Sequence, residues 1–197
     1  MQFTISTLAL LSSLAAAAPT HDARGTGIGT TFNLIFKGLG TAPKPVAALN
    51  SGTWFVASRN LRAEMVSDGT QANLFYRYNS PDTDSRIATA DTMIKITPGG
   101  TATVSSGKPV ELVNNNGTQH VYIMENASGV PTLWYDGGRF QACADGQGIF
   151  LSYIAVGQRR LVDCAPVEVA AVCSSGGVGS PLTGQLGKPL VVLCQSG

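Results

Sequence analysis

The stretch QHVYIME, residues 119–125, decides the fold class because its side chains alternate with a period of two. In an extended segment, Val121 and Ile123 point to one face and Tyr122 between them points to the other. The segment ANLFYRYN, residues 72–79, alternates in the same way. Alternation of this kind is typical of an antiparallel sheet with one buried face. No helical period is sustained beyond residue 18.

Short segments of this type recur along the chain, and turn sequences such as SDGT, TPGG and NNNGT separate them. The pattern predicts an all-β protein, with a single antiparallel β-sandwich or jelly-roll-like domain favoured over a barrel. A β-trefoil is the alternative, since about a dozen short strands would suit it. Strands are expected at Thr31–Lys37, Val46–Leu49, Thr53–Ser58, Leu61–Val66, Ala72–Tyr78, Thr92–Ile96, Thr101–Val104, Val110–Val113, His120–Met124, Thr132–Tyr135, Arg139–Ala142, Ile149–Ile154 and Val167–Val172.

The ends of the chain differ in composition from this β region. An apolar run, Leu8–Leu14, is followed by the small residues Ala15–Ala18, which is the pattern of a cleaved secretory signal. Secretion to the extracellular space or the cell wall is therefore expected. The predicted organisation is a signal peptide at 1–18, a flexible arm at 19–30, the β domain at 31–173, and a Gly/Ser-rich extension at 174–197 with a last short strand at Pro189–Leu193.

The charge balance argues against several classes of partner. The 197 residues carry 13 basic and 12 acidic side chains, a net charge of +1. So few charges cannot form a strongly basic face, which argues against nucleic acid and anionic membrane surfaces as partners. No further apolar run is long enough to predict a transmembrane anchor.

Four cysteines, Cys143, Cys164, Cys173 and Cys194, lie in the last part of the chain. In a secreted protein they are expected to form disulfides, and four cysteines allow three pairings. Cys164 and Cys173 flank the strand-like segment PVEVAAV, which would hold them roughly 30 Å apart, too far for a bridge. Of the other two pairings, Cys143–Cys164 with Cys173–Cys194 is favoured because each bridge closes a local loop. The Cys173–Cys194 bridge would tether the C-terminal extension.

The segment YDGGRFQACADG, followed by VDCAPVEVAAVC, resembles the phialide-type (PhiA) cell-wall proteins of filamentous fungi, a family of small secreted, IgE-binding-like domains. The shared features are a Gly-Gly before an Ala-Cys strand, a later Asp-Cys, a Val-rich strand and a third cysteine. They cover roughly the last third of the chain. The resemblance implies a secreted, wall-associated β-domain without enzymatic activity.

Catalytic groups are sparse. A Ser-His-Asp hydrolase needs a histidine in its pocket, but only His21, in the expected arm, and His120, at the start of an expected strand, are present. The segment GTGIGT precedes a strand and not a helix, so it does not predict a nucleotide site. The cysteines lack the spacing of a zinc site. No catalytic residue, metal site or cofactor is predicted.

The acidic residues also fit structural roles better than the paired carboxylates of a glycosidase. Those in turns are expected to cap backbone amides, and those in strands are expected to be exposed or paired. The turn residues are Asp82, Asp84, Asp136 and Asp145, and the strand residues are Glu64 and Glu168.

Two kinds of surface feature remain. Asn116 and Asn126 begin N-x-S/T sequons in turn-like segments and are expected glycosylation sites. Trp54, Trp134 and Tyr135 are candidate ligand-facing aromatic residues, although most aromatic side chains fit a core face equally well. Trp134 and Tyr135 are neighbours on opposite faces of an expected strand, so one of them should be partly exposed.

The sequence as a whole predicts a secreted, non-catalytic structural or recognition protein of a filamentous fungus. Its expected partner is a cell-wall polysaccharide or an extracellular protein. One alternative is a carbohydrate-binding module, which would present a row of exposed aromatic residues. Another is a hydrolase or inhibitor that acts through loop residues.

Overall fold

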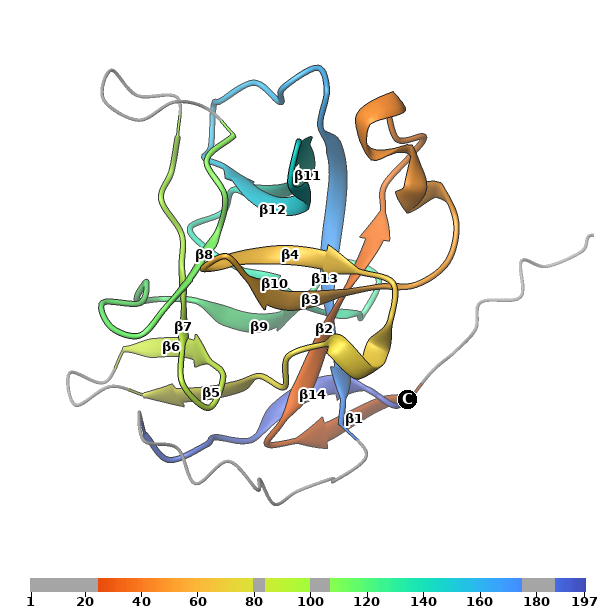
Figure 1. The fold of residues 1–197 in the computed structure, drawn as a ribbon. Coiled ribbons are helices and arrows are strands. Elements are labelled where there is room, and N and C mark those ends of the chain that lie inside the picture. The colour runs from red at the N-terminus through yellow and green to blue at the C-terminus, as the bar shows by residue number, and fades with distance from the viewer. Residues whose placement is uncertain (1–24, 80–83, 100–106, 175–186) are drawn as a thin grey trace, which may run out of the picture.

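The computed structural model describes residues 25–79, 84–99, 107–174 and 187–197 (Figure 1). Two short 3-10 helices, η1 (Lys44–Asn50) and η2 (Gly69–Gln71), interrupt a series of β-strands. The all-β class is confirmed. The strands are β1 (Thr26–Gly29), β2 (Phe32–Gly38), β3 (Trp54–Arg59), β4 (Arg62–Val66), β5 (Tyr76–Asn79), β6 (Ser85–Ala88), β7 (Met93–Lys95), β8 (Glu111–Val113), β9 (Tyr122–Glu125), β10 (Pro131–Trp134), β11 (Arg139–Asp145), β12 (Gly148–Ile154), β13 (Ala165–Cys173) and β14 (Val192–Gln195).

Six antiparallel strands close into a barrel, in the order β2–β3–β4–β12–β11–β13. The closure is the pairing of β13 with β2, which runs from Val167↔Gly38 to Cys173↔Phe32. These two strands cross the middle of Figure 1 in blue and orange. The closed ring differs from the sandwich or jelly roll that the strand pattern favours. Alternation shows only that one strand face is buried, and a barrel meets that condition as well as a sandwich does.

The β-trefoil alternative also differs from the observed strand order. A threefold repeat of one unit would place the barrel strands around the ring in chain order. Here β12 lies between β4 and β11, so the order departs from the chain order.

Three groups of strands extend the barrel. Strands β8, β7, β6 and β5 continue outward from β4 in that order. The β9–β10 hairpin joins β13 through Thr132↔Ala170. The β1–β14 ribbon also joins β13, through the parallel pair Val172↔Gln195. The barrel therefore carries an outer hairpin and a terminal ribbon on the same long strand.

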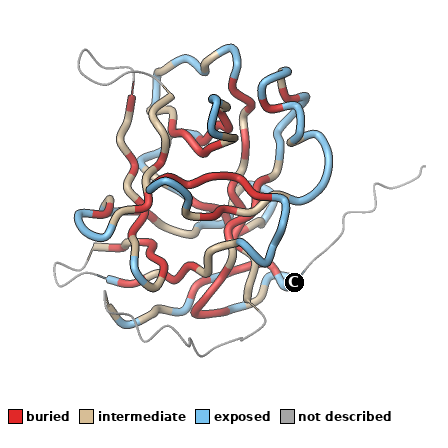
Figure 2. The backbone as a smooth tube through the Cα atoms, viewed as in Figure 1, coloured by how far each residue is buried: buried red, intermediate tan, exposed pale blue. Residues whose placement is uncertain are grey.

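The main core fills the barrel and the space beneath the added strands. Alternate residues of β2, Phe32 and Leu34, are 0% and 1% exposed and pack with Leu112 and Leu151. Figure 2 shows the buried stretches following the strands, while exposed stretches follow the loops. Burial of this extent is the main favourable contribution to folding.

One of the expected strands is wrong, and one observed strand of the β domain was not expected. Val46–Leu49, expected as a strand, lies in η1, where Pro43 precedes the helix and Pro45 cannot donate to a strand ladder. Val46 is instead fully buried in a small cluster with Ala42 and Ala165. The structure also contains β6, a strand that the sequence pattern did not predict.

The expected flexible arm is the second correction, because its last residues form β1 and pair with β14. Its glycines read as flexibility in the sequence, yet they let the strand pass close to a disulfide. A Cβ on Gly27 would lie 3.3 Å from Cys173 Sγ, and one on Gly29 would lie 3.2 Å from Cys194 Sγ.

Some expectations lie outside the described residues: the signal peptide at 1–18, residues 19–24 of the arm with His21, Asp82, the strand Thr101–Val104, and residues 175–186 of the extension. Within the described ranges, no helix has the length and apolar character needed to cross a bilayer.

Candidate functional site

His120, the histidine that the structure describes, lies on the surface beside Asp84 and Tyr122. It is exposed, with Nε2 3.7 Å from an Asp84 carboxylate oxygen and Nδ1 3.4 Å from the Tyr122 hydroxyl. The neighbouring Ser85 hydroxyl donates to the Val121 carbonyl at 2.7 Å and accepts from Arg77 Nε. Ser85 is buried and its hydroxyl donates to a backbone carbonyl, so it is not arranged as a nucleophile bonded to a histidine base.

Two carboxylates on barrel strands, Glu64 on β4 and Asp145 on β11, are held by one arginine. Arg62 Nε donates to Glu64 at 2.8 Å, and its terminal nitrogens donate to Asp145 at 2.6 and 3.2 Å. The Arg62 guanidinium also lies 5.0 Å from the centre of the Phe150 ring. These hydrogen bonds, together with the backbone amides of the β11–β12 turn, lower the pKa of Asp145 to about 2. A carboxylate so held is ionised at neutral pH and is therefore poorly suited to donate a proton as a general acid.

This ion pair predicts a specific pH dependence of stability. Since the pKa of Asp145 in the folded protein lies below its ordinary value of 3.8, the pair stabilises the protein above about pH 4 and the contribution disappears as pH falls through about 2. Asp145 is 43% exposed, so we expect Asp145→Asn to lower the free energy of unfolding by about 1 kcal/mol at pH 7. Urea titrations from pH 2 to 7 should show the variant and wild type converging at the acid end. A difference in the free energy of unfolding that stays constant from pH 2 to 7 would contradict the stabilising role of the Arg62–Asp145 pair. The control is Asp163→Asn, which removes an exposed carboxylate outside the pair.

Two more of the acidic residues considered as catalytic candidates, Glu168 and Asp136, take part in local structure. Glu168 accepts a hydrogen bond from the Asn126 amide. Asp136 has a positive φ of 43° in the turn between β10 and β11. No group of three or more potential metal ligands occurs within the described part of the chain.

Two of the three candidate ligand-facing aromatic residues are integrated into the fold. Trp54 is partly buried, and its indole nitrogen donates to the Ser51 carbonyl at 2.9 Å. Tyr135 packs edge-on against Tyr153 at 5.1 Å, and the Tyr153 hydroxyl donates to the Tyr135 carbonyl. Burial raises the pKa of Tyr153 to about 12. Both side chains are partly buried, and Trp54 also lines a surface pocket with Arg59 and Asp68.

The third candidate, Trp134, is exposed and forms an aromatic pair with the half-buried Tyr122. It is 37% exposed on β10 and faces Tyr122 across the β9–β10 hairpin, with ring centroids 5.9 Å apart and planes at 52°. The Arg77 guanidinium lies 5.7 Å from the centre of the Tyr122 ring. Met124, on the same face of β9, is 47% exposed. We call Arg77, Tyr122, Met124 and Trp134 the aromatic surface.

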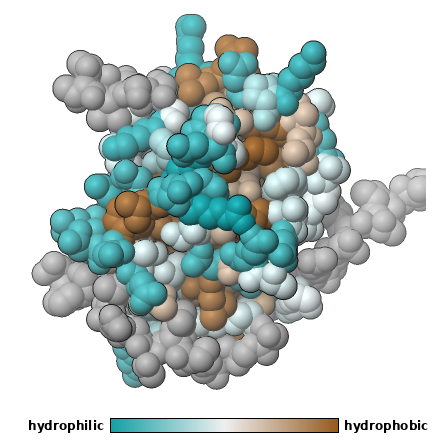
Figure 3. Space-filling view, in the orientation of Figure 1, coloured by the Kyte–Doolittle hydropathy of each residue, from teal (hydrophilic) through white to brown (hydrophobic). Residues whose placement is uncertain are grey.

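Tyr122 was not among the residues selected from the sequence, although a signal for it was present. The alternation in QHVYIME placed Tyr122 opposite the buried Val121, on the face that the structure leaves partly open. Its partner Trp134 could not be assigned to it, because the pairing depends on the register of β9 against β10. On the face shown in Figure 3, separate hydrophobic clusters lie among hydrophilic residues.

The two sequons occupy different environments. Asn116 is exposed, whereas its sequon partner Thr118 donates to the Ile96 carbonyl and accepts from the Ile96 amide. Asn126 is partly buried, and its side-chain oxygen Oδ1 accepts hydrogen bonds from the backbone amides of Ser128 and Val130. Thr118 thus links its loop to Ile96, whereas Asn126 organises a turn, and glycosylation at either asparagine stays a prediction.

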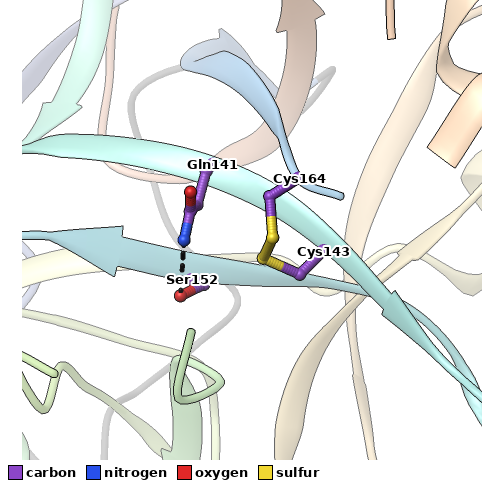
Figure 4. The surroundings of a disulfide bond; sticks show 4 residues. All are labelled: Gln141, Cys143, Ser152 and Cys164. Atoms are coloured by element: carbon purple, nitrogen blue, oxygen red, sulfur yellow. Dashed lines mark hydrogen bonds between the residues drawn. A yellow bond between two sulfur atoms is a disulfide. The ribbon is translucent and has the colours of Figure 1, made fainter. Parts of the chain in front are cut away.

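The disulfides fasten the elements around β13. Cys143 bonds to Cys164 and Cys173 bonds to Cys194, which confirms the pairing favoured because each bridge closes a local loop. Figure 4 shows the first bridge beside the buried Gln141 and Ser152, whose side chains lie 3.5 Å apart. This bridge ties β11 to the start of β13, and the second ties the end of β13 to β14. The C-terminal ribbon is thus held covalently as well as by strand pairing.

Comparisons with protein-family models, curated proteins and solved structures find no match to this chain.

Proposed function

We propose that the protein is a secreted, non-catalytic recognition protein of the fungal cell wall, and that its aromatic surface binds wall polysaccharide. The observation that carries this proposal is the exposed Trp134 paired with the half-buried Tyr122 on a short hairpin. Aromatic side chains offer a large, rigid contact area with a polar edge. The C–H groups on one face of a pyranose ring can pack against such a ring, and its hydroxyls can reach the guanidinium of Arg77.

The surroundings of the pair support recognition more than turnover. The hairpin is anchored to β13, so the rings are presented on a rigid scaffold. His120 contacts the Tyr122 hydroxyl and lies near Asp84, and the neighbouring Ser85 hydroxyl is already bonded to a backbone carbonyl. Two disulfides suit an oxidising compartment, and the resemblance to phialide-type wall proteins points to the same location.

Binding to insoluble polysaccharide tests the proposal. Purified protein should be depleted from solution by particles of β-1,3-glucan or chitin, and Trp134→Ala should weaken the association about thirtyfold, the equivalent of a 2 kcal/mol anchor residue. Tyr122→Ala should weaken it by a smaller factor, because its ring is more covered. Leu61→Ala removes a 66% exposed apolar side chain elsewhere and should bind like wild type. Equal binding by wild type and Trp134→Ala, or no binding by wild type to either polymer, would overturn the proposal.

A further inference from the structure

A groove of about 660 Å³ lies apart from the aromatic surface, where the turn entering β11 meets the loop leaving β12. Gly137 and Arg139 line it from the turn, and Val156, Arg160 and Val162 line it from the loop. Its volume falls in the range of sites that hold small organic ligands. The groove is therefore large enough for a molecule of that size.

The charge in the groove is positive. Arg139 and Arg160 both line it and are exposed, and no acidic residue lines it. Among the described residues, neither arginine makes a salt bridge or a side-chain hydrogen bond. The acidic residues nearest in sequence, Asp136 and Asp163, lie outside the lining. A guanidinium is always charged and presents a planar fork of donors that matches a carboxylate.

The rim of the same groove is apolar. Val156 and Val162 are 75% and 88% exposed, and both line the groove. Phe140 and Ile154 add apolar surface from the paired strands β11 and β12. Exposed β-branched side chains beside unpaired cations suit a ligand that is charged at one end and hydrocarbon at the other.

The elements that build the groove are braced. Asp136 and Gly137 both have positive φ, and the Gly138 amide closes their turn by donating to the Tyr135 carbonyl at 3.1 Å. The Gln158 side chain accepts from the Ala155 amide and donates to the Gly99 carbonyl, which fixes the start of the loop. The Cys143–Cys164 bridge fixes its end. A site held in place before binding loses less entropy when a ligand enters.

We propose that this groove binds a small amphipathic carboxylate, whose carboxylate meets Arg139 and Arg160 and whose hydrocarbon chain lies against Val156 and Val162. The site is separate from the aromatic surface and does not depend on polysaccharide recognition. Each site can therefore be tested while the other is intact.

Calorimetric titration of the full chain with octanoate tests the proposal. We expect binding in the millimolar range or tighter, which is reasonable for a ligand of this size. Acetate, which lacks the hydrocarbon, and 1-octanol, which lacks the charge, should each bind at least about tenfold more weakly. Raising the salt concentration should weaken octanoate binding. No measurable octanoate binding, or equal binding of octanoate and 1-octanol, would overturn the proposal.

Single substitutions place the site. Arg139→Gln and Arg160→Gln should each weaken octanoate binding at least about fivefold, since each removes a charge-assisted hydrogen bond. Arg159→Gln removes the same charge from a neighbouring exposed position outside the lining, and should change binding by less than about twofold. Trp134→Ala should leave octanoate binding unchanged. A loss with Arg159→Gln as large as that with Arg160→Gln would show a nonspecific charge effect and would contradict the assigned site.

Discussion

Replacing Gly138 by alanine is expected to lower the free energy of unfolding by about 3 kcal/mol, which is the cost of forcing a methyl group into packed structure. A Cβ at this position would overlap the hydroxyl and ring of Tyr153 and the carbonyl oxygen of Ile154. The Tyr153 hydroxyl could not move aside without breaking its 2.9 Å hydrogen bond to the Tyr135 carbonyl. The Tyr153 ring is also wedged between Tyr135 and Phe140.

Gly146 provides the matched control for this substitution. It lies in the exposed turn between β11 and β12, where a Cβ would have no atom within 4 Å and φ is not positive. Gly146→Ala should therefore change stability by no more than about 0.5 kcal/mol. Urea unfolding followed by circular dichroism compares the two variants. Similar stability of Gly138→Ala and Gly146→Ala would show that the packing around Tyr153 is not as described.

Removing the Cys143–Cys164 bridge should have a similarly large effect. The two cysteines are 21 residues apart, and in the chain-entropy model a loop of that length corresponds to about 3 kcal/mol. Both are buried against Phe150, with Leu161 packed beside them, so alanine is a better replacement than serine, whose hydroxyl would lose its hydrogen bonds to water. The double variant should unfold at a clearly lower urea concentration than wild type.

The Cys173–Cys194 bridge closes a loop of the same length, so loop entropy alone predicts an equal loss. Its removal should also release the β1–β14 ribbon, which pairs with β13 through a single residue pair. Limited proteolysis should then cut this ribbon before the barrel, whereas the Cys143–Cys164 variant should not show that early cut. A loss below about 1 kcal/mol in both variants would contradict the role assigned to the bridges.

Local features of this protein could be read from its sequence. Alternation in QHVYIME and ANLFYRYN was sufficient for the all-β class, and the length of the strand between Cys164 and Cys173 was sufficient to exclude their pairing. The Gly-Gly pair in YDGGRFQAC was visible as a motif. The physical reason for each glycine could not be seen in the sequence. Gly137 adopts a positive φ, and Gly138 leaves room for the Tyr153 side chain, a contact made across the sheet.

Features that depend on long-range pairing could not be read in this way. Closure of the barrel requires β13 to meet β2, and a period of two does not specify which strands are neighbours. The aromatic surface depends on the register that puts Tyr122 beside Trp134. The groove depends on two segments joined by the pairing of β11 with β12. For the same reason the sequence predicted a flexible arm where β1 forms. The glycines of β1 lie against a disulfide that joins two separate parts of the chain.

We propose that this protein recognises wall polysaccharide without chemically changing it. The most direct measurement incubates the purified chain with isolated fungal cell walls and follows both the protein left in solution and the soluble sugar released. The account predicts saturable depletion of wild type, much weaker depletion of Trp134→Ala, and no release of sugar above that from walls alone. Release of soluble sugar that grows with time and protein concentration, or depletion that is the same for wild type and Trp134→Ala, would contradict it.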